Sequence, residues 1–145
     1  MLDANAVRFN PFTGQPDYTS DGSSTILVPM GFDTKCTAAE AAGDPVIFSP
    51  SVDDTVIKLS DNSYGGDLVI GIIQQKLTIT TCRVIMIGVL DNIATGLTRG
   101  KPVWVSETGG LTTTKPTSGD LQILGNAFSS TGILVNIESR KTVLA

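Results

Sequence analysis

Short apolar runs separated by turn-forming residues follow one another along most of this chain. The runs are rich in Val, Ile and Leu, and clusters of Gly, Pro, Asn, Asp and Ser separate them. This pattern is typical of β-strands joined by hairpins and short loops. It predicts strands at residues 26–30, 45–49, 55–59, 68–73, 77–82, 83–90, 102–106, 121–125 and 132–137. A series of short strands with frequent turns predicts an all-β fold, a compact antiparallel β-barrel or sandwich.

One segment has the composition of a helix. Residues 37–42 read Thr-Ala-Ala-Glu-Ala-Ala, Gly43 closes them and Pro45 follows, as is common at the end of a helix. Isolated helices below about 12 residues are marginal, so this segment can form little more than one turn. The predicted fold therefore contains at most one short helix.

The first 33 residues differ from the rest. Pro11, Pro16 and the Asp-Gly-Ser-Ser run at residues 21–24 oppose regular helix and strand interiors there, yet the segment holds Phe9, Phe12 and Tyr18. A purely disordered tail is usually poor in aromatic residues. We therefore interpret residues 1–33 as an extended attachment arm, with these three side chains binding a partner, and residues 34–145 as a self-folding β-domain. A frayed terminus is the open alternative.

The chain contains a weak internal echo. Residues 66–71 (GDLVIG) resemble residues 119–125 (GDLQILG), and a second apolar strand follows each of them. The spacing exceeds the repeat length of about 20–50 residues that is usual in solenoids. Two explanations stay open, which are shared turn chemistry and an internal pseudo-repeat.

Composition narrows the function classes. Charged residues make up 17% of the chain and aromatic residues 6%, so the core must be built from Val, Ile and Leu. The ten Lys and Arg residues are scattered and the formal net charge is -4, which argues against a nucleic-acid-binding face. No apolar run approaches the roughly 20 residues of a membrane span, and the start lacks the basic and apolar regions of a signal peptide.

Few residues are candidates for catalysis or metal binding. The chain has no His, which is the commonest general base and the usual partner of nucleophiles. Asp53 and Asp54 form the best carboxylate pair, and we interpret them as part of a solvated turn. The alternative is a cation site with the nearby Asp61, Asn62 and Asp67, but their spacing fails the calcium-loop pattern. We expect no metal, no cofactor and no enzymatic activity.

The two cysteines, Cys36 and Cys82, lie far apart in the sequence. Free cysteines are usually buried, so the first interpretation is a pair of reduced thiols in the core. A disulfide is the alternative and needs an oxidising compartment. Two thiols without His cannot complete a zinc site, which usually has four ligands.

Trp104 lies in the middle of the predicted strand at residues 102–106, which a hairpin turn at residues 107–110 follows. A lone Trp in a strand is usually part of the core. A subunit interface is the main alternative, because Trp is enriched at interfaces. We predict Trp104 as an oligomer-interface residue.

Residues 96–106 (GLTRGKPVWVS) and 109–120 (GGLTTTKPTSGD), continued by residues 121–127 (LQILGNA), resemble a module of phage virion proteins. The module recurs in head-fibre, decoration and tail-fibre chains. Residues 43–73 are similar to the start of small β-rich capsid decoration proteins. The resemblance implies a capsid decoration, or cement, protein that is made in the host cytoplasm and located on the virion surface.

The same resemblance implies partners and excludes others. It implies binding to the major capsid protein and self-association, often as a homotrimer, and no catalytic residue comes with it. We expect neither a nucleic-acid nor a membrane partner. A fibre or adhesion module that binds a host glycan or receptor is the alternative, with Tyr64 and Trp104 as the candidate aromatic platform. A small cell-wall hydrolase would have to use carboxylates from the set Asp53, Asp54, Asp67 and Glu107.

Overall fold

The computed structural model describes residues 7–9, 16–18 and 29–144, which form strands and no helix. The strands are β1 (Val7–Phe9), β2 (Pro16–Tyr18), β3 (Met30–Lys35), β4 (Pro45–Phe48), β5 (Val56–Lys58), β6 (Gly71–Thr78), β7 (Thr81–Leu90), β8 (Pro102–Val105), β9 (Leu111–Thr112), β10 (Gly119–Leu121), β11 (Gly125–Ala127), β12 (Ile133–Asn136) and β13 (Thr142–Leu144). The all-β prediction is confirmed. Within these residues no helix is long and apolar enough to cross a membrane.

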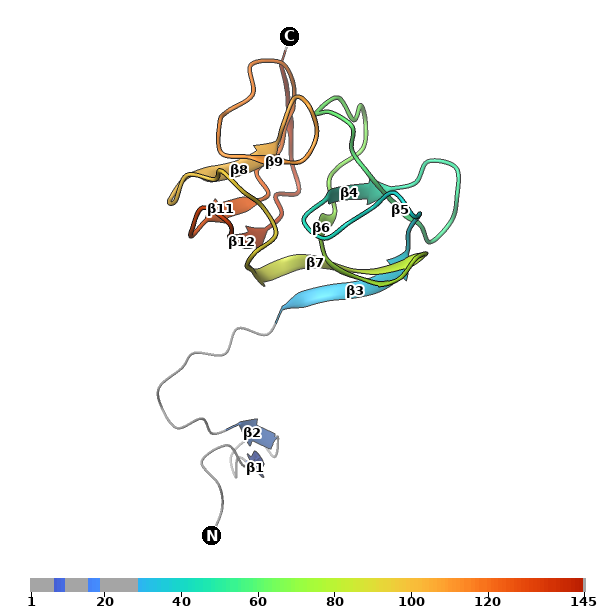
Figure 1. Ribbon diagram of the computed structural model, residues 1–145, viewed down its shortest axis with the longest axis vertical. Coiled ribbons are helices and arrows are strands. Elements are labelled where there is room, and N and C mark those ends of the chain that lie inside the picture. Colours follow the sequence, from blue (N-terminus) through green and yellow to red (C-terminus); the bar gives the residue numbers. More distant parts are fainter. Residues whose placement is uncertain (1–6, 10–15, 19–28, 145) are drawn as a thin grey trace.

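Most strands belong to one curled antiparallel sheet. Its order is β5-β4-β6-β7-β12-β11-β8-β9, and β3 pairs with β7 beside this path. Figure 1 shows β3 and β7 side by side, with β4, β5 and β6 on one side of the domain and β8, β9, β11 and β12 on the other. Two small sheets complete the structure, one of β10 and β13 and one of β1 and β2.

The long strand β7 joins the two sides of the sheet. Its first part pairs with β6, its last part pairs with β12, and β3 runs along residues 81–87. Met30 lies opposite Ile87 and Gly31 lies opposite Ile85, so Met86 has no partner in β3. This extra residue is a β-bulge, which shifts the alternation of side chains between the two faces of a strand. Ile85 and Leu90, five positions apart, therefore both point into the same core.

The domain has two apolar cores. The small core consists of Cys36, Val46, Val56, Ile73, Cys82 and Val84. Around this core each strand pairs with the next in the order β3, β7, β6, β4, β5. A β-bridge between Lys35, in β3, and Thr55, just before β5, closes the circle. These five strands thus enclose the small core.

The main core lies between the two sides of the sheet. Ile47, Ile72 and Ile85 enter it from one side, and the strands β8, β11 and β12 supply side chains from the other. Its full set of buried residues is Ile47, Tyr64, Val69, Ile72, Ile85, Leu90, Leu97, Val103, Val105, Leu124, Ala127, Ile133 and Val135. Aliphatic residues dominate it, as the composition predicts.

The strand order repeats itself from the two ends of the sheet toward its middle. The first unit, β4 to β7, has the order β5-β4-β6-β7, and the second unit, β8 with β9, β11 and β12, has the order β9-β8-β11-β12. In each unit a Pro-Val pair begins a strand, and the Val lies opposite a Gly. These pairs are Val46 with Gly71 and Val103 with Gly125. The two glycines end the two echo segments, so the echo has a structural counterpart and the internal pseudo-repeat is the better explanation.

The predicted helix at residues 37–42 does not form, and turns take its place. The Glu40 carboxylate fixes this segment, since it accepts hydrogen bonds from Thr37 N at 2.6 Å, Thr37 Oγ1 at 2.7 Å and Lys58 N at 3.2 Å. The last contact joins this segment to β5. A contact across the fold has overridden a weak local preference, which a helix this short cannot resist.

The predicted strands 68–73, 77–82 and 83–90 are two strands in the structure. β6 begins only at Gly71, and a turn at Ile79 and Thr80 divides the predicted strand 77–82 between β6 and β7. β-Branched residues are typical of strands rather than turns, so no residue signalled this hairpin. The hairpin turn at residues 107–110 is confirmed, since Ser106 N donates to Gly110 O between β8 and β9.

Strand β3 spans the predicted boundary between residues 33 and 34. Its pairing with β7 runs from Met30 to Lys35, so the sheet includes residues that the prediction gave to the arm. The predicted strand at residues 26–30 lies outside the described residues except for its end, where Met30 begins β3.

We expect Gly125→Ala to lower the free energy of unfolding by about 2–4 kcal/mol in urea titrations. Gly125 has a φ of +151°, and an added Cβ would overlap Leu134 O and lie 3.0 Å from Val135 Cα. Gly66→Ala is the matched control, because a Cβ there meets nothing within 4 Å. That control should change the free energy by less than about 0.5 kcal/mol. Equal effects of the two substitutions would contradict the close approach of β11 and β12.

The hydrogen bonds of Glu40 also predict an acid-sensitive stability. Burial alone would raise the pKa of Glu40, but the bonds from Thr37 and Lys58 outweigh it and hold this pKa below its ordinary value of 4.5. A carboxyl whose pKa is lower in the folded state stabilises the fold above its unfolded-state pKa. That contribution is lost as the pH falls through the folded-state value. Unfolding measured from pH 7 to pH 3 should therefore show a smaller loss of stability below about pH 4.5 in Glu40→Gln than in the wild type. Exposed Glu138 supplies the control Glu138→Gln, which should keep the wild-type slope.

Candidate interaction surface

One face of the second unit is apolar and uncovered. Cross-strand partners and alternate residues of a strand share a face. The pairs Met30 with Ile87, Val89 with Leu134 and Pro102 with Asn126 therefore identify one continuous surface on the outside of β3, β7, β12, β11 and β8. We call this surface the outer face, and its residues are Met30, Ile87, Val89, Pro102, Trp104, Thr112, Asn126, Phe128, Leu134 and Asn136.

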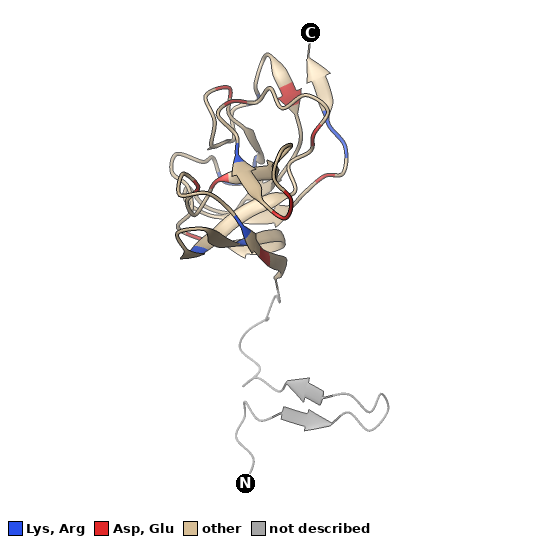
Figure 2. Cartoon of the chain, turned by 90° about the vertical axis from the view of Figure 1, so that its right-hand side faces the viewer, with Lys and Arg blue, Asp and Glu red and all other residues tan. Residues whose placement is uncertain are grey.

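The large apolar side chains of the outer face are exposed to solvent. Met30 is 58% exposed, Val89 48% and Leu134 43%, and Ile87 and Phe128 are also exposed. None of the ten outer-face residues is charged. Charged residues are scattered over the rest of the described domain, on loops and strand ends as well as on β3 and the start of β7 (Figure 2). Contiguous exposed apolar patches of this kind mark interaction sites in soluble proteins.

The two units differ in whether other parts of the protein cover the two faces of their strands. In the first unit Val46 faces the small core, and Ile47, on the opposite face of the strand, lies in the main core. In the second unit the equivalent Val103 faces the main core, and Trp104 takes the place of Ile47. At Val46 and Ile47 both faces of the first unit are thus covered by protein, whereas at Val103 and Trp104 only one face of the second unit is covered.

Trp104 is not a core residue. It is half-buried on the outer face of β8, opposite Thr112, and its neighbours Val103 and Val105 are fully buried on the other side of the strand. This position is compatible with the predicted role at a subunit interface. The sequence pattern did not identify the other residues of the outer face, because each strand taken alone shows the ordinary alternation of buried and exposed positions.

The predicted arm residues are placed only in part. Phe9 belongs to β1 and Tyr18 to β2, which pair as a two-stranded antiparallel sheet. Phe12 lies outside the described residues. The role of the three as partner-binding residues stays a prediction.

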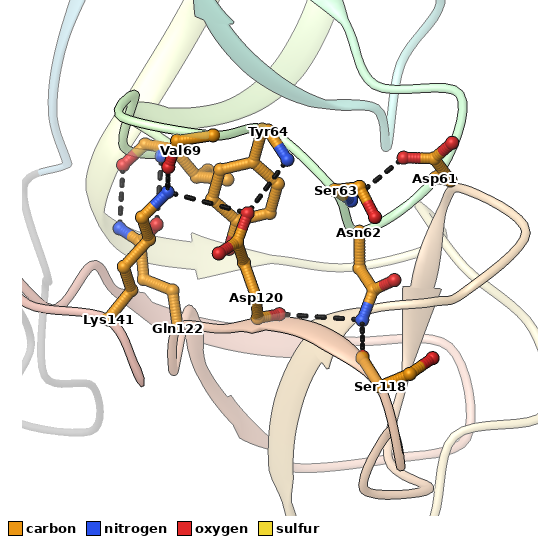
Figure 3. A network of polar contacts seen from close by, with 10 residues as sticks. Asp61, Asn62, Ser63, Tyr64, Val69, Ser118, Asp120, Gln122 and Lys141 are labelled. Atoms are coloured by element: carbon orange, nitrogen blue, oxygen red, sulfur yellow. Dashed lines mark hydrogen bonds and ion pairs between the residues drawn. The ribbon is translucent and has the colours of Figure 1, made fainter. Parts of the chain in front are cut away.

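Buried polar groups form a network between the loop after β5 and the strand β10 (Figure 3). The Asp120 carboxylate accepts a hydrogen bond from Tyr64 N at 2.8 Å and lies 3.4 Å from the Lys141 ammonium. Asn62 Nδ2 donates to Ser118 O at 2.6 Å. These bonds anchor the small sheet of β10 and β13 to the main sheet, so the network explains the fold rather than a reaction.

Gln122 belongs to the same network. Its amide oxygen accepts a hydrogen bond from Val69 N, and its amide nitrogen donates to Val69 O and Glu138 O. A side chain that satisfies both backbone groups of one residue replaces a missing strand partner. Residue 69 precedes β6 and residue 122 precedes β11, so Gln122 joins the two echo segments.

Tyr64 is buried, with 5% of its surface exposed. Its ring lies 4.5 Å below the Lys141 ammonium, and burial raises its pKa well above the ordinary range. Tyr64 therefore cannot belong to an exposed aromatic platform. Of the two residues predicted for a glycan-binding platform, the structure leaves Trp104 alone.

The carboxylates considered for hydrolysis do not gather at one site. Asp53 and Asp54 are exposed in the loop between β4 and β5, as the turn interpretation predicts. The Glu107 carboxylate accepts hydrogen bonds from Thr117 N, Thr117 Oγ1 and Ser118 N and so holds the loop after β9. Across the described part of the chain, no group of three or more Cys, Asp or Glu residues is placed to hold a metal ion.

No protein-family model, curated protein or solved structure matches this chain. The resemblance to phage virion modules therefore stays a prediction from residues 43–73 and 96–127.

Proposed function

We propose that this protein is a capsid decoration protein, a non-enzymatic structural component that binds the outside of a phage head and stabilises it. The observation that carries the proposal is the outer face, a surface of the main sheet without charged residues on which large apolar side chains are exposed. A surface of this kind suits permanent assembly with other protein. The resemblance of residues 96–127 to phage virion modules supports the choice of assembly.

The proposed partner of the outer face is a second copy of the chain. None of the outer-face residues is charged, so contact between the outer faces of two copies brings no like charges together. Its apolar composition, which includes Trp104, resembles the buried part of homo-oligomer interfaces. We propose a homotrimer, the stoichiometry that the resemblance implies, in which different parts of the outer face contact the two neighbouring copies.

The proposed partner of residues 1–33 is the major capsid protein. Phe9, Phe12 and Tyr18 would supply the apolar contacts, since an extended segment offers a large contact area for few residues. The N-terminal residues would then bind the capsid, and the β-domain would bind further copies of the chain. The protein would be made in the host cytoplasm and located on the virion surface.

A fibre or adhesion module is the second candidate function. Trp104 favours it, as an aromatic ring half-exposed on a rigid strand can stack on a sugar. Binding on a glycan array that Trp104→Ala abolishes without unfolding the protein would favour this function over decoration.

We expect Leu134→Lys to abolish self-association. The substitution places a charge at the middle of the outer face, where burial against a second copy would leave it unpaired. Sedimentation of the full-length protein should show oligomers for the wild type and monomers for the variant. Ile79→Lys is the matched control, because Ile79 is 73% exposed on the β6–β7 turn, away from the outer face. A wild type that stays monomeric at all concentrations would refute self-association through this face.

We expect deletion of residues 1–25 to abolish binding to phage particles that lack this protein. The β-domain should stay folded, because the sheet begins only at Met30. Co-sedimentation with particles measures binding, and circular dichroism of the free protein checks the fold. The triple variant Phe9→Ala, Phe12→Ala, Tyr18→Ala tests the aromatic contacts with the chain length unchanged. Full particle affinity after the deletion would show that attachment lies elsewhere.

A further inference from the structure

Two cysteines from distant parts of the chain meet in the small core. Cys36 is 5% exposed and Cys82 is fully buried, and both are free thiols. They belong to the same six-residue core, and Cys36 is one of the causes that raise the pKa of Cys82. The two thiols are therefore neighbours in the core that no covalent bond joins.

The pairing of β3 and β7 explains this proximity. Thr34 lies opposite Cys82, and Cys36 follows two positions later on the same face. Cys36 is the first residue after β3, and its N–H still donates to Thr80 O at 2.9 Å. One cysteine is thus held in the centre of the sheet, whereas the other lies at a strand end, where the backbone can adjust.

A lysine supplies charge to this pair. Lys76 lies opposite Cys82 on β6, and its ammonium lies 3.1 Å from Cys36 Sγ. The same ammonium donates to Thr37 O at 2.5 Å and to Ile79 O at 2.8 Å, which fixes its position. Thiol–disulfide exchange begins with attack by a negatively charged sulfur, and this contact places a positive charge beside Cys36 Sγ.

Cys82 is set for the second role in such a reaction. Burial, followed by the neighbouring Cys36, raises the pKa of Cys82 above its ordinary value. Its thiol therefore favours the protonated form until a mixed disulfide forms at Cys36. This asymmetry resembles that of an attacking and a resolving cysteine.

We propose that Cys36 and Cys82 form a reversible disulfide between β3 and β7, with a small-molecule disulfide such as glutathione disulfide as the oxidant. The Cys36 thiolate attacks one sulfur of the oxidant, and one glutathione leaves as a thiolate. Cys82 then gives its proton to a thiolate or to water and attacks Cys36 Sγ, and the second glutathione leaves. Two protein thiols are oxidised, and one glutathione disulfide is reduced to two glutathione molecules.

The bridge would fix an edge of the sheet. β3 pairs with β7 alone along most of its length, and it carries the connection to residues 1–29. A covalent bond at the end of β3 would transmit any pull on that connection directly to the central strand. The bridge does not depend on the proposed function, but on a virion it would form when the particle leaves the reducing host cytoplasm.

The test equilibrates the full-length protein in glutathione buffers of increasing disulfide content, starting once from the reduced and once from the oxidised protein. Alkylation followed by intact-mass measurement counts free thiols, bridged chains and mixed disulfides. The same buffers with denaturing urea give the reference for the unfolded chain. We expect the ratio of disulfide-bridged to reduced chains to be at least about tenfold higher in the folded protein than in the unfolded chain.

Lys76→Met is the informative variant, with Lys35→Met as its control. Loss of the Lys76 ammonium should slow formation of the disulfide. The Lys35→Met variant should form the disulfide at the wild-type rate, because Lys35 is exposed and does not contact either sulfur. Equilibration from the reduced and from the oxidised protein distinguishes a disulfide that forms slowly from one that is thermodynamically unfavourable. The proposal is overturned if both directions converge on a bridged fraction no higher than that of the unfolded chain, or on mixed disulfides alone.

Discussion

The β-bulge at Met86 determines which core or surface each part of β7 faces. Before it, β7 presents Cys82 and Val84 to the small core, and Ile85 to the main core. Beyond it, Leu90 faces the main core, and Ile87 and Val89 point outward. A strand without the bulge would keep Ile87 on the same face as Ile85. One extra residue thus allows a single strand to serve two cores and an exposed surface.

The two units use the same strand order but differ in what covers them. The first unit is covered on one face by the closure of β3 against β5 and on the other by the main core. The second unit has only the main core. Buried polar groups join segments that do not pair as strands. Gln122 forms hydrogen bonds with the backbone of Val69, and Asp120 forms an ion pair with Lys141. The outer face corresponds to the Ile47 face of the first unit, which packs against the second unit in the main core, whereas no element of the described residues covers the outer face in return.

This asymmetry connects the fold with the proposed function. An apolar face on a monomer is a liability unless another protein covers it. A decoration protein works in many copies, so covering this face with further copies would turn the liability into an assembly contact. The Cys36–Cys82 pair lies at the opposite end of β3 from Met30, where a bridge would strengthen the strand without touching that contact.

The all-β class follows from the residue pattern, as do most strand positions, the hairpin at residues 107–110 and the echo of the two GDL segments. These features depend on alternation and turn chemistry among near neighbours, which residue types express directly. Packing between distant segments established that residues 37–42 are not helical, that Tyr64 is buried, that Trp104 faces outward and that the two thiols meet. Each of these depends on a contact between residues far apart in the chain, such as Glu40 with Lys58 or Met30 with Ile87. Burial is a property of pairing and register, and neither is expressed within a single strand.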